Sequence, residues 1–223
     1  MKSLPIQIEI SPSLYSKNPD SSELGRKIIS KSIELLNEMG FEVFTFKKLG
    51  LVINSPESSI YRYFENKHTL LIYLTSWYWK WTEYRIFFAT TNVDCAEERL
   101  RKAINILTKP VLEDNSISYV NEVLLSEIIF SESLKTYHTK NVDAENKKGC
   151  FKAYKSVVHR VSNIILEISP KYELPHMLIS TVIEGAHQQK YFADHLPSLT
   201  DVTIAKDIIS VFYTDLVFNF LKK

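Results

Sequence analysis

Four polar side chains near residue 60 have the types and spacing to form hydrogen bonds with the edges of nucleic-acid bases. In a helix over residues 55–64, Ile60 and Phe64 lie four residues apart and face the interior. This leaves the polar side chains pointing elsewhere: Glu57, Ser58, Tyr61 and Arg62. A carboxylate can accept a hydrogen bond from cytosine N4, so Glu57 is a candidate for base recognition, although its charge also repels phosphate.

Two earlier helices must position this segment. Apolar residues recur every three or four positions over residues 22–39, and Gly40 supplies a C-terminal stop. Thr45 is suited to be the N-cap of a short second helix over residues 46–53. Asn54 suits a left-handed turn that leads into the third helix.

The third helix is predicted to begin with Ser55 as its N-cap and Pro56 as its first residue, and to end near Phe64. The three helices then have the layout of a helix-turn-helix. In such a motif the N-terminal part of the last helix enters a DNA major groove, which is about 12 Å wide.

The sequence of this region resembles a known family. Residues 45–71, preceded by a helix that ends in Met39-Gly-Phe41, are similar to the DNA-binding domain of TetR-family transcriptional regulators. The strongest match is Ile60-Tyr-Arg-Tyr-Phe-Glu-Asn-Lys67 followed by Leu70, and the resemblance covers about residues 22–72. It implies a DNA-binding regulator with a divergent, helical C-terminal domain.

Carried over by position, the resemblance implies two groups of DNA contacts. The residues expected at or near base edges are Lys47, Glu57, Ser58 and Tyr61, and those expected to hold phosphates are Thr45, Ser59, Tyr63 and Lys67. The sequence departs from the family pattern at several positions. The turn reads Ile53-Asn-Ser-Pro56 where Ala-Gly-Val-Ser is usual, Gly50 replaces an alanine, Ser58 a glycine and Tyr63 a histidine. These departures leave the operator sequence undetermined.

The rest of the chain is predicted to be helical as well, because glycine is scarce and turn signals are far apart. We expect an all-α fold of about nine helices, the later ones over residues 67–91, 95–112, 116–135, 144–168, 174–195 and 201–221. The predicted organisation is an N-terminal arm (1–21), a DNA-binding domain (22–66) and a C-terminal domain for effector binding and dimerisation (67–223).

Aromatic residues along 67–91 suggest a wall for a ligand. The resemblance implies a ligand cavity in the C-terminal domain, and the candidate lining residues are Trp81, Tyr84, His187 and Tyr191. Core packing explains the same aromatic stripe and is the preferred interpretation. His187, Tyr191 and His195 share one helix face, but their types and number do not predict a metal site.

The last helix is apolar around most of its circumference, so it must be covered on more than one side. We expect one face to meet a second copy of the chain. With the preceding helix it would form a four-helix bundle between subunits, and the predicted interface residues are Ile208, Phe212, Leu216 and Phe220.

The charge, the cysteine content and the apolar runs of the sequence limit the classes of protein to which it can belong. The 223 residues carry 27 Lys and Arg against 26 Asp and Glu, a net charge of only +1. Residues 43–80 nevertheless hold five basic and two acidic side chains, a local charge of +3 that is compatible with a DNA-facing patch. Two cysteines, Cys95 and Cys150, and the lack of a long apolar run favour a cytoplasmic protein without a membrane span.

No catalytic motif, phosphate-binding loop or metal-ligand spacing occurs, so we expect neither an enzyme nor a cofactor. The sequence thus predicts a homodimeric repressor that leaves a palindromic DNA operator when a small-molecule effector binds. The alternative is a TetR-like DNA-binding protein without a small-molecule effector, controlled by a protein partner. An all-α enzyme that merely contains a helix-turn-helix is a third, weaker hypothesis.

Overall fold

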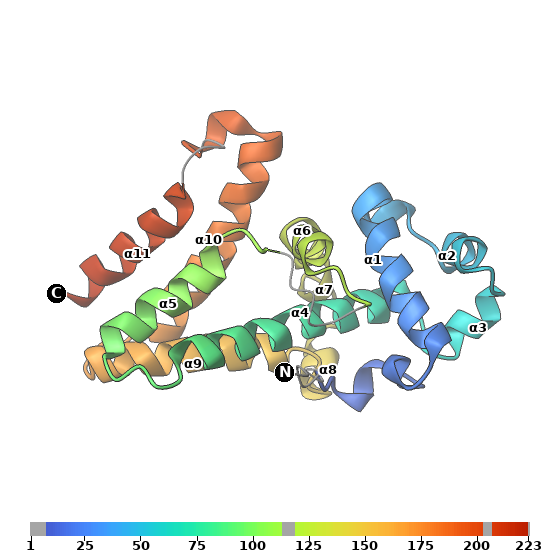
Figure 1. Ribbon diagram of the computed structural model, residues 1–223, viewed down its shortest axis with the longest axis horizontal. Helices are drawn as coiled ribbons and strands as arrows, with labels where there is room; N and C mark the ends of the chain where they lie inside the picture. Colours follow the sequence, from blue (N-terminus) through green and yellow to red (C-terminus); the bar gives the residue numbers. More distant parts are fainter. Residues whose placement is uncertain (1–7, 113–118, 203–206, 223) are drawn as a thin grey trace, which may run out of the picture. The chain divides into compact units, whose positions relative to one another are not determined.

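The computed structural model describes residues 8–112, 119–202 and 207–222 (Figure 1). Every regular element among them is helical, which confirms the all-α fold class. The α-helices are α1 (Glu23–Val43), α2 (Phe46–Ile53), α3 (Glu57–Tyr61), α4 (Lys67–Thr90), α5 (Ala96–Thr108), α6 (Glu122–Glu132), α7 (Leu134–Tyr137), α8 (Val142–Lys147), α9 (Lys152–Ile168), α10 (Pro175–His195) and α11 (Ile208–Leu221), with short 3-10 helices at Pro12–Leu14, Pro19–Ser21 and Pro197–Leu199.

Two of the predicted long helices are each replaced by two helices in the structure. In place of the helix predicted over 116–135 the structure has α6 and the four-residue α7, which ends at Tyr137, and residues 116–118 lie outside the described ranges. In place of the helix predicted over 144–168 it has α8, which begins at Val142, and α9. The second division occurs at Gly149, whose φ of 83° is in the left-handed region that ends a helix. The predicted final helix begins later than expected, at Ile208, and residues 203–206 lie outside the described ranges.

The chain forms two compact units. The first consists of Met1–Lys80 and Val111–Ala153, and the second of Trp81–Pro110 and Tyr154–Lys223. This division differs from the predicted boundary at residue 67, because α6, α7 and α8 group with the N-terminal helices. Helix α4 is continuous and contributes residues to both units.

In the first unit, α1 packs against α2 and α6. Its inward face holds buried isoleucines and leucines, and Gly40 interrupts the helix with φ 74° and ψ 165°. A side chain at this φ would be strained, so glycine suits the break. The described part of the N-terminal arm is tied to the same unit, since Leu14 is buried and the Ser16 N–H donates to the Tyr63 carbonyl across 2.8 Å.

The first half of α4 is buried on nearly all sides from Leu70 to Trp79. This confirms that the aromatic stripe is largely core, since Leu70, Leu74, Trp77 and Trp81 are at most 2% exposed. The second half differs, because Tyr84, Phe87 and Phe88 are exposed.

In the second unit, α5, α10 and α11 pack against one another (Figure 1). Tyr213 and Val217 are buried on α11, while the Ser210 hydroxyl is 2.5 Å from Asn105 Oδ1 on α5. Among the residues that the structure describes, no helix is both long and apolar enough to cross a membrane.

Candidate nucleic-acid interface

Helix α2 begins and ends as its sequence predicts. The Thr45 side chain is the N-cap and accepts a hydrogen bond from the Lys48 N–H across 3.2 Å. Asn54 ends the helix in the left-handed conformation, with φ 53° and ψ 52°. The four buried residues of α2 are Phe46, Leu49, Gly50 and Ile53, so its other side faces outward.

Gly50 has a packing role that its helix propensity does not reveal. A Cβ atom at this position would lie 2.7 Å from the Ser55 carbonyl oxygen, closer than real Cβ contacts come. The Ser55 N–H also donates to the Gly50 carbonyl across 2.9 Å. Glycine therefore lets the turn fold back tightly on α2, which explains this departure from the family pattern in physical terms.

Helix α3 is shorter than predicted. Pro56 is its N-cap rather than its first residue, and the helix ends at Tyr61 instead of near Phe64. Beyond it the N–H groups of Tyr63 and Phe64 both donate to the Ile60 carbonyl, in a turn that carries both rings inward. Ile60 and Phe64 are completely buried, as their spacing predicts.

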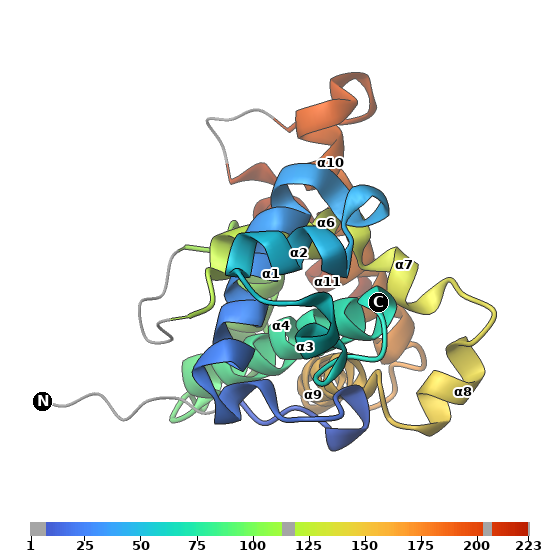
Figure 2. The same cartoon turned by 90° about the vertical axis from the view of Figure 1, so that its right-hand side faces the viewer.

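The outward side of α2 and α3 presents polar groups that are free to bind. Figure 2 shows the two helices from the side on which they lie. Lys47, Ser58 and Arg62 are exposed and form no hydrogen bond or ion pair with any described residue. Tyr61 is 49% exposed, its ring centroid lies 5.1 Å from that of Phe46, and its hydroxyl donates to Glu57 across 3.3 Å. Partial burial and the Glu57 charge raise the pKa of Tyr61, so it remains a neutral donor at neutral pH.

Tyr63 is not on this outward side. It is 2% exposed, its hydroxyl is 2.8 Å from the Ser22 hydroxyl on the N-cap of α1, and Lys17 lies 5.1 Å from its ring centroid. These contacts secure the arm and the start of α1 against the turn after α3. Tyr63 is thus placed as a buried structural residue, which disfavours its predicted role as a phosphate contact.

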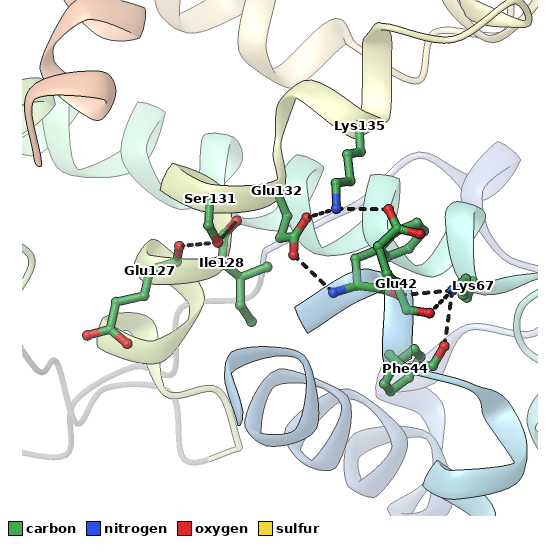
Figure 3. Close-up of polar contacts among 9 residues, drawn as sticks. Glu42, Phe44, Lys67, Glu127, Ile128, Ser131, Glu132 and Lys135 are labelled. Carbon is green, nitrogen blue, oxygen red and sulfur yellow. Dashed lines mark hydrogen bonds and ion pairs between the residues drawn. The ribbon is translucent and has the colours of Figure 1, made fainter. Parts of the chain in front are cut away.

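Lys67 also has partners within the protein (Figure 3). Its ammonium donates to the carbonyl oxygens of Phe41, Glu42 and Phe44 across 2.8, 3.1 and 3.2 Å, and it lies 4.6 Å from the Phe41 ring centroid. A lysine in this position caps the end of α1 and satisfies carbonyls that have no helical partner. This geometry likewise disfavours the phosphate contact predicted for Lys67.

The same end of α1 is held from α6 and α7 (Figure 3). The buried Glu132 carboxylate accepts a hydrogen bond from the Phe41 N–H across 2.9 Å and pairs with Lys135 across 2.7 Å. Lys135 also pairs with Glu42 across 2.9 Å. Although burial opposes it, these hydrogen bonds raise the pKa of Lys135, and the Lys135 contact lowers the pKa of Glu42.

The sequence-predicted contacts therefore divide into two groups. Thr45, Lys47 and Ser58 are exposed, Glu57 and Ser59 are half-buried, and Tyr61 is exposed, so these six are displayed together by α2 and α3. Arg62 joins them. Its position predicts a side chain that points away from the interior, but the contacts carried over from the family resemblance do not include it, although it lies inside the strongest motif. The outward side of α2 also carries Leu51, 78% exposed, and Val52, 49% exposed.

The four predicted ligand-lining residues do not gather around one cavity. Trp81 is buried with the Arg85 guanidinium 4.6 Å from its ring centroid, and Tyr84 is half-exposed against Phe88. His187 is buried, and burial together with the nearby Lys190 charge lowers its pKa to about 3.

Tyr191 is 37% exposed, and its ring is tilted against that of His195, with the centroids 4.5 Å apart. A polar cavity of about 430 Å³ does occur in the second unit, among residues of α4, α5 and α9, but none of the four predicted residues lines it. Within the described ranges, no group of three or more His, Cys, Asp or Glu side chains is arranged to hold a metal ion.

The predicted interface residues share one face of α11. Phe212 and Phe220 are 56% and 47% exposed, while Ile208 and Leu216 are half-buried. A shallow hollow of about 440 Å³ lies along this face, lined by Phe212, Asp215, Leu216, Asn219 and Phe220. An apolar face of this kind is typical of a surface that another protein covers.

Comparison with known proteins supports the fold. No family model and no curated protein matches the sequence. Among solved structures, the chain is similar to the fatty acid degradation regulator FadR from Bacillus halodurans, at 15% identity and a TM-score of 0.60, over 96% of each chain. It is also similar to the superantigen PfiT, at 14% identity and a TM-score of 0.56, over 92% of this chain and 97% of that one. At these identities the likeness shows a shared helical fold.

Proposed function

We propose that this chain is a cytoplasmic, sequence-specific DNA-binding transcriptional regulator. The observation that carries the proposal is the contrast between the two sides of the helix-turn-helix. Its inward residues Ile60 and Phe64 are completely buried, whereas its outward polar residues Lys47, Ser58 and Arg62 are exposed without protein partners among the described residues. Such a rigid motif with free donors on one side is suited to the major groove.

The exposed groups have distinct roles in this proposal. Lys47 and Arg62 supply positive charge that binds phosphates or the acceptor atoms of guanine. Ser58 and the Glu57–Tyr61 pair, at 3.3 Å, present both donors and an acceptor to base edges. Because only a few basic side chains take part, we expect binding to depend on geometry more than on bulk charge.

Two copies would bind a near-palindromic operator, with the α3 helices in successive major grooves about 34–36 Å apart. The exposed α11 face is the proposed dimer contact, since Phe212 and Phe220 would be buried there against a second α11. The α10 helix, which packs against α11, would complete a four-helix bundle between subunits.

A small-molecule effector in the second unit would release the repressor from DNA. Helix α4 runs without interruption from Lys67 to Thr90. Lys67 contacts carbonyls at the end of α1, and Thr90 lines the polar cavity. A ligand that favours one placement of α4 needs a coupling free energy of only about 1–3 kcal/mol to change operator occupancy appreciably.

The decisive experiment is selection of bound duplexes from a random pool, followed by titration of the winning sequence over a range of salt concentrations. We expect one near-palindromic sequence and an affinity that falls with salt. Variants Lys47→Ala and Arg62→Ala should weaken binding. If the protein retains no duplex, or retains all sequences equally, the proposal is wrong.

A further inference from the structure

The polar cavity of the second unit has features of a binding site for one chemical class of ligand. Its volume of about 430 Å³ lies within the range of small-molecule sites. It is formed by α4, α5 and α9 and combines aromatic surface with charged groups. The side chains on which the argument rests are Glu83, Phe87, Arg99, His159, Arg160 and Asn163.

The two arginines of the cavity differ in how fully their hydrogen bonds are used. Arg99 forms a bidentate pair with Glu167, in which both terminal nitrogens donate to the two carboxylate oxygens. This is the most complete pairing that a guanidinium and a carboxylate can form. Arg99 therefore has little capacity left for a ligand.

Arg160, in contrast, has spare capacity. Its single polar contact in the described part of the chain is with Glu83, at 3.4 Å through one nitrogen, and its side chain is 38% exposed. A guanidinium has five N–H donors. The unused N–H donors of Arg160 carry positive charge and favour an anion rather than a cation as the ligand.

Neighbouring groups would hold the anion and an apolar body beside it. Asn163 Nδ2 lies 3.3 Å from His159 Nε2, and His159 Nδ1 lies 3.4 Å from His176 Nε2, so a chain of hydrogen bonds fixes the His159 ring near Arg160. Phe87 is 46% exposed, with the Arg160 guanidinium 5.6 Å from its ring centroid. A flat apolar group can stack on this ring while its acid group reaches Arg160.

We infer that the cavity binds a small carboxylate carried on a flat, apolar body, with Arg160 as the residue that binds the carboxylate and Phe87 as the stacking surface. The inference rests on the proposed function only in taking this ligand as the effector. Binding to the cavity and release from DNA are separate measurements, so each can fail without the other.

The test is calorimetric titration of the full-length protein with 1-naphthoate, using 1-naphthamide as the uncharged analogue of the same shape. We expect 1-naphthoate to bind at least about tenfold more tightly than 1-naphthamide, because only the former forms a charge-assisted pair with Arg160. Acetate should bind far more weakly, since it lacks the apolar body.

Two variants locate the site. Arg160→Gln should weaken 1-naphthoate binding by about tenfold or more and leave 1-naphthamide unchanged. Arg101→Gln is the matched control, because Arg101 is on α5 of the same unit but stacks on Phe218, 4.0 Å from its ring centroid, outside the cavity. We expect the Arg101→Gln variant to bind 1-naphthoate with the same affinity as the unmodified protein.

Three outcomes would overturn the inference: no 1-naphthoate binding, equal affinity for acid and amide, or equal losses in the Arg160 and Arg101 variants. If Arg160→Gln does not fold, the comparison of acid with amide on the unmodified protein still decides. An operator that is bound but not released by 1-naphthoate would leave the binding site in place and disprove its role as the effector site. Loss of all DNA binding would instead refute the proposed function.

Discussion

The Phe41 N–H donates to the Glu132 carboxylate across 2.9 Å, joining residues that are 91 positions apart in the chain. Both groups are buried, so replacing Glu132 with alanine leaves an N–H without an acceptor. We expect Glu132→Ala to lower the free energy of unfolding by about 1–3 kcal/mol in urea titrations. Glu132→Gln retains an acceptor oxygen and should lose less.

The control for this prediction is Glu127→Ala. Glu127 is an exposed glutamate on the same helix, α6, and accepts a hydrogen bond from Asn37 across 2.6 Å. An exposed contact of this kind should contribute less than about 0.5 kcal/mol. Equal losses in the two variants would mean that the buried hydrogen bond has no special importance.

Lys67 and Lys47 should have separable effects. Because Lys67 donates to three carbonyls at the end of α1, we expect Lys67→Met to lower the melting temperature and leave the salt dependence of DNA binding unchanged. Lys47→Met should keep the melting temperature and reduce the slope of log K against log salt by about 1. If the Lys67 variant also reduced this slope, the result would support the phosphate contact that the sequence predicts for Lys67.

Two tyrosines in neighbouring turns allow a similar comparison. The Tyr63 hydroxyl is buried against Ser22, so Tyr63→Phe should cost about 1 kcal/mol of stability without changing base preference. The exposed Tyr61 is expected to behave oppositely, with Tyr61→Phe altering DNA affinity or preference at near-constant stability. Unfolding curves and duplex titrations on both variants test this, and an exchange of the two effects would contradict it.

We expect His187 to make the stability of the protein sensitive to acid. Its pKa is about 3 in the folded state against 6.5 for an ordinary histidine, so between these values the unfolded chain binds the additional proton. The free energy of unfolding should therefore fall as the pH drops below 6.5. At pH 5 we expect it to be about 2 kcal/mol lower than at neutral pH. We expect a plot of the unfolding free energy of His187→Gln against pH to be flatter over this range than that of the unmodified protein, and an unchanged slope would contradict the prediction.

The α11 face should be required for dimers. Phe212 is 56% exposed, and a charge placed there would be buried without a partner at the proposed contact. We expect Phe212→Glu to give monomers by light scattering and to weaken operator binding. Phe88→Glu, at a phenylalanine of similar exposure on α4, should remain dimeric. A dimer that persists in the Phe212 variant excludes this face as the interface.

The sequence was sufficient to locate the helices of the N-terminal region, because their signals are local. The Thr45 N-cap, the left-handed Asn54 and the buried Ile60 all occupy the positions that their residue types predict. Where the helices end was harder to predict. Tyr63 and Phe64 fit a helical pattern, yet both lie in a buried turn. Tyr63 contacts the arm and the N-cap of α1, and Phe64 packs against Tyr73 of α4, so the partners lie elsewhere in the sequence.

Side-chain roles depend even more on distant partners. The sequence around Lys67 gives no local sign that its ammonium faces three carbonyls at the end of α1. Likewise, the spacing of Trp81 and His187 is compatible with a cavity wall or a core, and both are buried. The DNA and ligand contacts stay predictions until binding is measured.

The contacts of Glu132 and Lys135 with the end of α1 have a consequence for folding during synthesis on the ribosome. The unit that displays α2 and α3 is discontinuous and includes residues up to Ala153 of 223. About two-thirds of the chain must therefore leave the exit tunnel before that unit can acquire all its contacts. Until then the nascent helix-turn-helix lacks the partners that hold Phe41 in place, and expression of the first 66 residues alone should yield an incompletely folded fragment.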